Sequence, residues 1–321
     1  MNGNILPASI DVSIIIINFN EDKLLHECLS SIVEHIANVE YEIFVVDNGS
    51  TAGDVKNIVS NFTCAKLIEN GKNLGFAAAN NIGLNHARGK YVLFLNNDTK
   101  LLSNIVKSAF DYAEERLEKV FVGCQLLNPD FSKQESVFNY PTLWNNFTEN
   151  FFLYKLFPKS KLFNKYYQNY YDYKEPIEVE VIQGAFMFCS TESVKKLNGF
   201  DERFFFYSEE TDLCYRFKQA GGKIFFLPKL SLIHYGGATT GKNLWFKYQN
   251  QARGKIQYYQ KHFHGADYLF AILFHLIGLL LRWIQNTLIG LLLFKKSLLI
   301  KGYYFLRQIF VYPKNLFKAD S

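Results

Sequence analysis

The first hundred residues alternate between short apolar runs and segments whose apolar residues have helical spacing. Between the first two runs, apolar side chains recur at helical intervals from Leu24 to Val33. Strands that alternate with helices in this way indicate βαβ units and a mostly parallel sheet. The apolar runs with strand character cover about residues 12–17, 42–46, 64–69 and 91–95.

The helices of this half begin with recognisable signals. Asn20 is the expected N-cap of the first helix, with the acids Glu21 and Asp22 in its first turn. Further helices are expected over 54–62, within 73–87 after an opening Gly turn, and over 103–117.

The pattern is less regular downstream. Pro228 is expected to end one strand before another begins. The downstream strands are expected over 121–127, 178–189, 224–227 and 230–235, and the helices over 193–197 and 212–220.

Three of the predicted strands end in polar side chains. The first ends at Asn18 and Asn20, the second at Asp47, and the fourth at Asn96 and Asp98. Ligands of open parallel sheets bind just beyond the carboxyl ends of the strands. These strand ends therefore predict one polar crevice that suits a nucleotide.

The last sixty residues differ from the rest. Apolar runs over 268–281 and 288–294 are separated by Arg282, Gln285 and Asn286. Residues 263–321 hold seven basic and two acidic residues, which account for the whole net charge of +5. A spanning helix would place Arg282 in the middle of a membrane at high cost, so we expect interfacial or re-entrant helices on an anionic inner leaflet.

Bulk properties exclude some classes of protein. The part before residue 263 has balanced charge and lacks the basic stripe that nucleic-acid binding needs. The five cysteines are scattered and form no CxxC, which is typical of reduced thiols in a cytosolic protein. The N-terminus shows no basic-then-apolar signal pattern, since its first apolar run is the predicted strand.

The chain resembles family 2 glycosyltransferases of the GT-A fold, in particular the bacterial rhamnosyltransferase-like branch that builds surface polysaccharides. The resemblance covers about residues 10–260, and the matching segments follow the family's order. These segments are VSIIIINFN (12–20), VVDNGS (45–50), NLGFAAANNIG (73–83), YVLFLNNDT (91–99), GAFMFCS (184–190), GFDERFFFYSEETDLCYRFKQAGGKIFFLP (199–228) and HYGGATT (234–240).

The resemblance implies an α/β fold, a Rossmann-like mixed and mostly parallel sheet flanked by helices. It assigns residues 1–262 to the GT-A domain, with an aromatic insertion at about 135–178 on the acceptor side. Residues 263–321 would then form a helical tail that associates with the membrane.

For the nucleotide, the resemblance implies that Asp47 accepts a hydrogen bond from N3–H of uracil or thymine, and that Asn96 contacts the ribose or the sugar. Asn18 and Asn20 are expected to contact the base and ribose, and Asn73 and Gly75 to border the nucleotide. Asp47 could instead form an Asx-turn with the next two residues, and both roles can hold together.

For the metal, Asp98 is the expected ligand of Mg²⁺ or Mn²⁺. The family motif usually ends in two acids or in Asn-Pro-Asp, whereas this chain has Asn96-Asn97-Asp98. One carboxylate suffices when substrate phosphates supply further ligands. Asp98 could instead only cap the following helix or turn. His234 could complete the metal shell or meet the diphosphate, or it could be structural.

For catalysis, Glu210 aligns with the family's general base, where Glu replaces the usual Asp. Glu209 and Asp212 are the competing candidates. The aromatic run 204–207 would partly desolvate these acids and raise a carboxyl pKa toward working pH. Acids at a helix start could also merely complement the helix dipole.

The expected function is inverting, metal-dependent transfer of a sugar from dTDP-rhamnose or a UDP-hexose to a hydroxyl of a polysaccharide or lipid-linked oligosaccharide precursor. The enzyme would work at the cytoplasmic face of the cell membrane. The rivals are a non-catalytic nucleotide-sugar-binding protein, a processive membrane synthase and a nucleotide-sugar pyrophosphorylase. A synthase would need several spanning helices and QxxRW, and a pyrophosphorylase a basic Gly-rich loop where this chain has Asn18-Phe19-Asn20.

Overall fold

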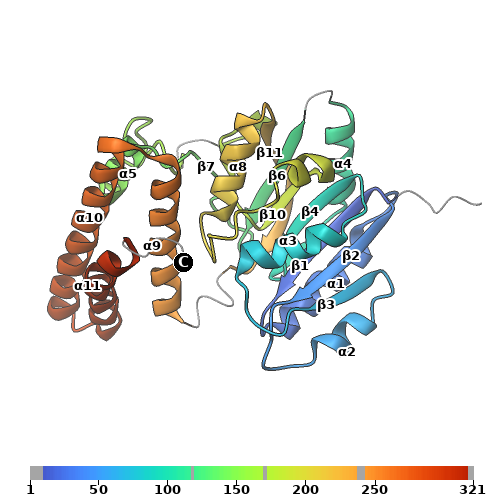
Figure 1. Cartoon of the computed structure of the whole chain (residues 1–321), viewed down its shortest axis with the longest axis horizontal. Coiled ribbons are helices and arrows are strands. Elements are labelled where there is room, and N and C mark those ends of the chain that lie inside the picture. The colour runs from blue at the N-terminus through green and yellow to red at the C-terminus, as the bar shows by residue number, and fades with distance from the viewer. Residues whose placement is uncertain (1–9, 117–118, 169–171, 237–242, 317–321) are drawn as a thin grey trace, which may run out of the picture. The chain divides into compact units, whose positions relative to one another are not determined.

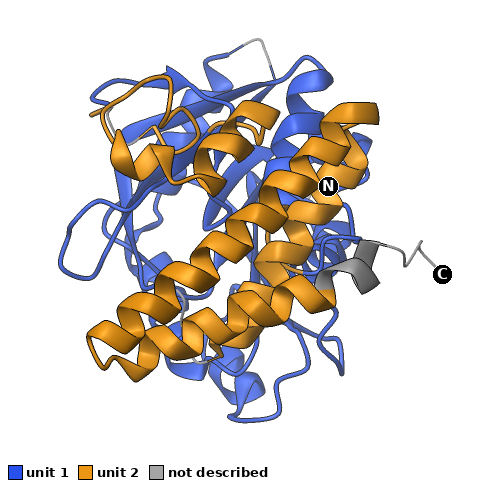
Figure 2. Cartoon of the chain, turned by 90° about the vertical axis from the view of Figure 1, so that its left-hand side faces the viewer, with its two compact units in different colours: residues 1–138, 173–205, 209–239 blue, residues 139–172, 206–208, 240–321 orange. Residues whose placement is uncertain are grey.

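The computed structural model describes residues 10–116, 119–168, 172–236 and 243–316. The chain forms two compact units, which Figure 2 distinguishes by colour. Unit 1 comprises residues 1–138, 173–205 and 209–239, and unit 2 comprises residues 139–172, 206–208 and 240–321.

Unit 1 is built on a sheet that holds nine strands of the described chain (Figure 1). Its order is β3-β2-β1-β4-β10-β6-β11-β5, and β8 pairs with β11. The short strands β7 (Val137–Phe138) and β9 (Val181–Ile182) form a separate pair. The large sheet consists of β1 (Val12–Asn18), β2 (Tyr41–Asp47), β3 (Ala65–Glu69), β4 (Tyr91–Asn96), β5 (Thr99–Leu101), β6 (Val120–Leu127), β8 (Ile177–Glu178), β10 (Phe186–Ser190) and β11 (Lys223–His234).

The pairing confirms a mixed, mostly parallel sheet. Strands β3, β2, β1 and β4 run parallel to one another, and β6 runs parallel to β11. Strand β10 is antiparallel to both β4 and β6, and β5 is antiparallel to β11. Helices flank the sheet, as the sequence predicts.

The central strands are buried on both faces, as strands of a sheet covered by helices must be. Val12, Ile14 and Ile16 of β1 belong to one apolar core with Leu25 and Leu29 of α1. The helices of unit 1 are α1 (Asp22–His35), α2 (Val55–Ser60), α3 (Phe76–His86), α4 (Ile105–Glu114), α7 (Thr191–Lys196) and α8 (Glu209–Gln219).

The predicted cap of the first helix is wrong. The N-cap of α1 is Glu21, and no side chain caps this end. Asn20 has a left-handed backbone (φ 56°), which Asn adopts more readily than most residues. Its Oδ1 accepts hydrogen bonds from the amides of Thr51 (2.8 Å) and Ala52 (3.1 Å), so it fixes the loop after β2 instead.

Two further strand boundaries differ from prediction. Strand β11 continues past Pro228, and its register against β6 shifts between Leu227 and Ser231. An irregular stretch tolerates Pro because no ladder hydrogen bond needs its missing N–H. The run expected as one strand over 178–189 is divided among β8, β9 and β10.

Unit 2 is helical. Helix α10 packs against α5, α9 and α11, and the long helices are seen together in Figure 2. By length and composition, α10 could cross a membrane, and among the described helices it alone meets that criterion. The helices of this unit are α5 (Leu143–Asn150), α6 (Leu153–Leu156), α9 (Leu244–His262), α10 (Gly265–Leu292) and α11 (Lys296–Leu316).

Helix α10 has two unlike faces. The inner face is buried and includes Ala271, His275 and Gly278. Arg282 belongs with this inner face, because its guanidinium donates to Asn150 Oδ1 (3.0 Å) and to the Glu149 carbonyl (3.2 Å) on α5. Arg282 therefore breaks the apolar run in the sequence, but its charge lies on the inner face of α10 and the outer face remains apolar. The exposed apolar side chains of α10 are Leu269, Phe270, Leu273, Leu280, Ile284, Leu288, Ile289, Leu291 and Leu292.

Candidate active site

The sheet brings the polar ends of β1, β2 and β4 to one edge. Asn18 lies beside Asp47 in the β1–β2 register, and Asn96 lies beside Ile17 in the β1–β4 register. Asn97 Nδ2 donates to Asn18 Oδ1 at 2.7 Å, so Asn18 is buried and joined to the turn after β4. The predicted convergence of these strand ends is present.

Asp47 closes the turn after β2 with Ser50, three residues on, whereas the Asx-turn considered above would bond the second residue on, Gly49. Its carboxylate accepts hydrogen bonds from the Ser50 amide (3.1 Å) and the Ser50 hydroxyl (2.5 Å). A carboxylate has about four lone-pair sites. The hydrogen bonds from Ser50 therefore leave room for a further hydrogen bond from a base, which stays a prediction.

Asn48, which the motif analysis did not single out, organises the segment before α3. Its amide donates to Asn73 Oδ1 (3.1 Å) and to the Gly75 carbonyl (3.1 Å), and its oxygen accepts from the Leu74 amide (3.0 Å). Gly75 has φ 87°, and a Cβ there would lie 2.5 Å from the Phe205 carbonyl oxygen. Only glycine fits this position.

Asp98 and His234 lie side by side. Strand β5 pairs with the end of β11, with Thr99 opposite His234, and the Tyr235 amide donates to the Asp98 carbonyl at 2.9 Å. Both side chains are buried, and His234 Nε2 lies 3.4 Å from Asp98 Oδ1. Asp98 does not cap the next helix, since Asn104 caps α4.

The residues around Asp98 fit a divalent cation. Asn96 Oδ1 is buried and has no hydrogen-bond partner among the described residues, although Asn96 Nδ2 lies 3.5 Å from His234 Nε2. The oxygens of a carboxylate and an amide suit Mg²⁺ or Mn²⁺, and a neutral imidazole is a common metal ligand in proteins. The described chain has no group of three His, Cys, Asp or Glu placed to hold a metal. Substrate phosphates would therefore have to complete the shell.

The candidate base lies near the start of β10, the strand that pairs with β4. Helix α8 begins at Glu209, so Glu210 lies in its first turn. Gly184 lies beside Glu210, because a Cβ built at Gly184 would be 3.6 Å from the Glu210 Cβ. The next residue, Ala185, accepts a hydrogen bond from the Asn96 amide at 3.1 Å. Asp98 and Glu210 thus both adjoin the carboxyl end of β4.

Glu209 has a different environment from its neighbour. It is buried, whereas Glu210 is half-buried. Burial, together with the charge of Glu210, raises the pKa of Glu209 well above its ordinary value. Its Oε2 has no hydrogen-bond partner among the described residues. Because its side chain is buried, Glu209 is less accessible to an acceptor hydroxyl than Glu210.

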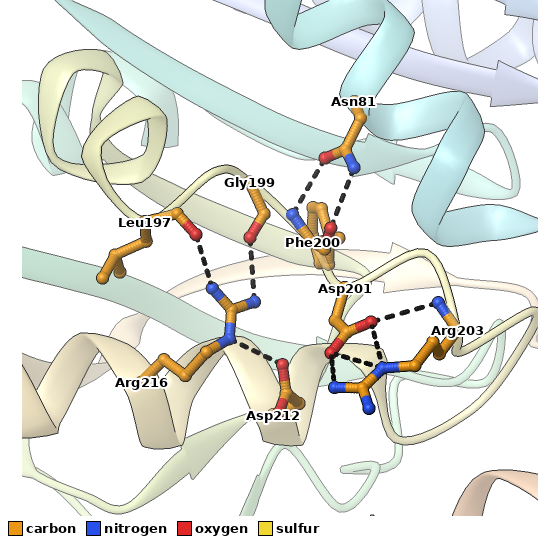
Figure 3. Close-up of polar contacts among 8 residues, drawn as sticks. All are labelled: Asn81, Leu197, Gly199, Phe200, Asp201, Arg203, Asp212 and Arg216. Atoms are coloured by element: carbon orange, nitrogen blue, oxygen red, sulfur yellow. Dashed lines mark hydrogen bonds and ion pairs between the residues drawn. The ribbon is translucent and has the colours of Figure 1, made fainter. Parts of the chain in front are cut away.

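Asp212 is fully buried and joined to Arg216. The Arg216 Nε donates to Asp212 Oδ2 at 2.7 Å, and its two terminal nitrogens donate to the carbonyls of Leu197 and Gly199, each at 2.8 Å (Figure 3). The carboxylate orients an arginine that fixes the loop before α8. This placement suits a positioning role for Asp212.

Asn81 of α3 holds the same loop from the opposite side. Its side chain accepts from the Phe200 amide (2.8 Å) and donates to the Phe200 carbonyl (2.8 Å), as Figure 3 shows. Further along, Asp201 pairs with Arg203. The segment that leads to Glu210 is therefore anchored to both α3 and α8.

A mixed, mostly parallel sheet with polar residues at its strand ends is the architecture of the GT-A fold. The profile of glycosyl transferase family 2 matches residues 13–196, more than half of the chain. The chain belongs to glycosyl transferase family 2 and is a glycosyltransferase. A profile described as the N-terminal domain of galactosyltransferase matches residues 164–238.

Two of the most similar relatives are rhamnosyltransferases. The chain is 28% identical to rhamnosyltransferase WbbL of Escherichia coli over 235 residues, 69% of this chain and 82% of that protein. It is 25% identical to an N-acetylglucosaminyl-diphospho-decaprenol L-rhamnosyltransferase of Mycobacterium tuberculosis, over 63% of this chain and 68% of that protein. The rhamnosyltransferase-like assignment is thereby confirmed.

A solved structure supports the fold. The chain is similar to a mannosyltransferase from Pyrobaculum calidifontis in complex with GDP-Man and Mn²⁺, with TM-score 0.56 and 17% identity. The match covers 96% of this chain and 88% of that chain.

Proposed function

We propose that this glycosyltransferase is metal-dependent and inverting, with dTDP-rhamnose or a UDP-hexose as donor. Support comes from two observations: Asp98 lies beside His234, and Glu210 lies beside Gly184, whose neighbour Ala185 accepts a hydrogen bond from the Asn96 amide at the end of β4. Asp98, His234 and Asn96 would hold the cation, which when bound offsets the negative charge that develops on the departing diphosphate.

The chain's own residues complete the reaction. Asp47, Asn18 and Asn73 border the nucleotide side of the edge, where Asp47 would read the edge shared by uracil and thymine. Glu210 accepts the proton of the acceptor hydroxyl as its oxygen attacks the anomeric carbon. One displacement of the nucleoside diphosphate inverts that carbon.

The acceptor that we propose is a lipid-linked oligosaccharide precursor of a surface polysaccharide. Support comes from the Mycobacterium relative, whose name specifies a diphospho-decaprenol acceptor. The aromatic insertion would then lie on the acceptor side, and residues 263–321 would act as a separate membrane-associating segment.

A screen of nucleotide sugars tests this function. The full chain is incubated with dTDP-rhamnose, UDP-glucose, UDP-galactose and GDP-mannose, in the presence of either Mn²⁺ or a chelator. Mass spectrometry measures the release of the nucleoside diphosphate. We expect release from a dTDP- or UDP-sugar that requires the cation. Turnover that persists with the chelator would remove the metal from the proposal.

We further propose that the outer face of α10 and the turn after it bind the cytoplasmic face of an anionic membrane. Leu292 is 76% exposed and Phe294 94% exposed, and Lys295 and Lys296 follow directly. Apolar side chains next to basic ones suit the interface of an anionic leaflet. Because Arg282 pairs with α5, a helix lying in the interface keeps that charge out of the lipid.

The double variant Leu292→Ser/Phe294→Ser should bind vesicles of phosphatidylglycerol and phosphatidylcholine at least about tenfold more weakly. Each buried apolar side chain of this size contributes about 1.5–3 kcal/mol, and about 1.4 kcal/mol is tenfold in affinity. Co-sedimentation measures the loss. Phe131→Ser, which removes an exposed aromatic of unit 1, is the matched control. Equal binding by both variants would exclude this surface, and wild-type protein that resists alkaline extraction would instead indicate a spanning α10.

A further inference from the structure

The His234 imidazole is held from behind by one side chain, Gln134. Gln134 Oε1 lies 2.9 Å from His234 Nδ1, and Gln134 Nε2 donates to the His234 carbonyl at 2.6 Å. The two residues are 100 positions apart in the chain. Nothing in the motif pattern predicts this pairing.

The direction of the Gln134 amide is determined by its other partners. Gln134 Nε2 also donates to Asn128 Oδ1 at 2.8 Å, and both oxygens around it can only accept. The amide oxygen must therefore face the imidazole. An amide oxygen cannot donate, so His234 Nδ1 must carry the hydrogen.

Backbone hydrogen bonds hold Gln134 in place beside His234. Its amide donates to the Leu126 carbonyl of β6 at 2.8 Å, and its carbonyl accepts from Gln125 Nε2 at 2.9 Å. Strand β6 runs alongside β11, which ends at His234. Gln134 is thus attached to the neighbour of the strand that carries the histidine.

With Nδ1 protonated, a neutral imidazole presents a lone pair at Nε2. That nitrogen lies 3.5 Å from Asn96 Nδ2 and 3.4 Å from Asp98 Oδ1, so a cation bound by the Asp98 carboxylate would lie within reach of its lone pair. We propose that Gln134 is a positioning residue that fixes the Nδ1–H tautomer and so directs His234 Nε2 toward the cation site. Partners behind metal-binding histidines typically change metal affinity 10- to 100-fold when removed. This inference rests on the proposed metal dependence.

Two measurements on the full chain test the inference. Without metal, ¹⁵N-histidine NMR reports the His234 tautomer, which should be Nδ1–H in wild-type protein and mixed in Gln134→Met. With Mn²⁺ alone as probe, electron paramagnetic resonance of the free ion should show about 10- to 100-fold weaker binding by Gln134→Met. Gln134→Glu keeps an acceptor at Nδ1 and loses the donor, so it should retain the tautomer and tight binding.

The controls distinguish the positioning role of Gln134 from the proposed role of His234 as a metal ligand. Gln219→Met removes an exposed amide at the end of α8 and leaves the contacts of Gln134 and His234 untouched, so it should match wild-type protein in both readouts. An unchanged tautomer in Gln134→Met, or equal losses in Gln134→Met and Gln134→Glu, would overturn the positioning role. Wild-type affinity for Mn²⁺ in His234→Asn would instead overturn His234 as ligand, while the tautomer result would stand.

Discussion

Replacing Glu210 by Gln should reduce sugar transfer by about 10²- to 10⁴-fold, the usual contribution of a general base. Gln has nearly the same shape as Glu but accepts no proton. Because Glu210 lies beside Gly184 rather than among the nucleotide-side residues, donor affinity should change little. Single-turnover transfer and calorimetric titration with the nucleotide measure the two quantities.

The neighbouring acids provide the comparison. Glu202→Gln on the same loop keeps an oxygen to accept from Asn81 Nδ2 (3.0 Å) and should transfer sugar normally. In Glu209→Gln, an amide replaces a carboxyl group whose pKa burial already raises, so transfer should fall far less than in Glu210→Gln. If Glu209→Gln is the variant that loses transfer, the base has been assigned to the wrong residue of the pair.

Replacing Asp98 by Asn should lower turnover by about 10²-fold or more and should weaken the Mn²⁺ dependence of nucleotide binding. A metal ion contributes several kcal/mol of charge stabilisation, and about 1.4 kcal/mol changes a rate tenfold. The carboxylate beside His234 supplies the anionic ligand, and an amide of the same size removes its charge. Turnover against Mn²⁺ concentration measures the effect.

Asp111→Asn is the control for charge removal. Asp111 forms a surface ion pair with Lys107 on α4, and such pairs contribute only about 0–1 kcal/mol to stability. This variant should follow the wild-type dependence on Mn²⁺. An Asp98→Asn enzyme that follows it too would show that transfer does not depend on this carboxylate.

Local sequence signals predict the structure of the first hundred residues well. The strands that end at Asn18, Asp47 and Asn96 are short apolar runs between helical segments, and parallel pairing then brings their ends together. No long-range information is needed for this step. The sequence therefore predicts the edge of the sheet that carries the polar cluster.

Pairings between distant segments could not be predicted in the same way. Strand β5 has three residues and forms because β11 runs beside it, and this pairing brings His234 to Asp98. The Gln134–His234 contact likewise depends on how β6 and β11 align. At Asn20 a local signal was present but gave the wrong result. The residue type favours a helix N-cap, but its side chain accepts hydrogen bonds from the amides of Thr51 and Ala52 in a distant loop.

The absence of a side chain at Gly184 matters for Glu210, which lies beside it. The φ of Gly184 lies outside the left-handed range, and a methyl group there would meet Glu210 only at ordinary contact distance. Alanine is therefore sterically permitted at position 184, where it would touch the first carbons of the Glu210 side chain. On the proposed assignment of Glu210 as base, a larger residue at position 184 is expected to narrow the range of alcohols that can approach, so that acceptor preference would depend on the size of this one residue.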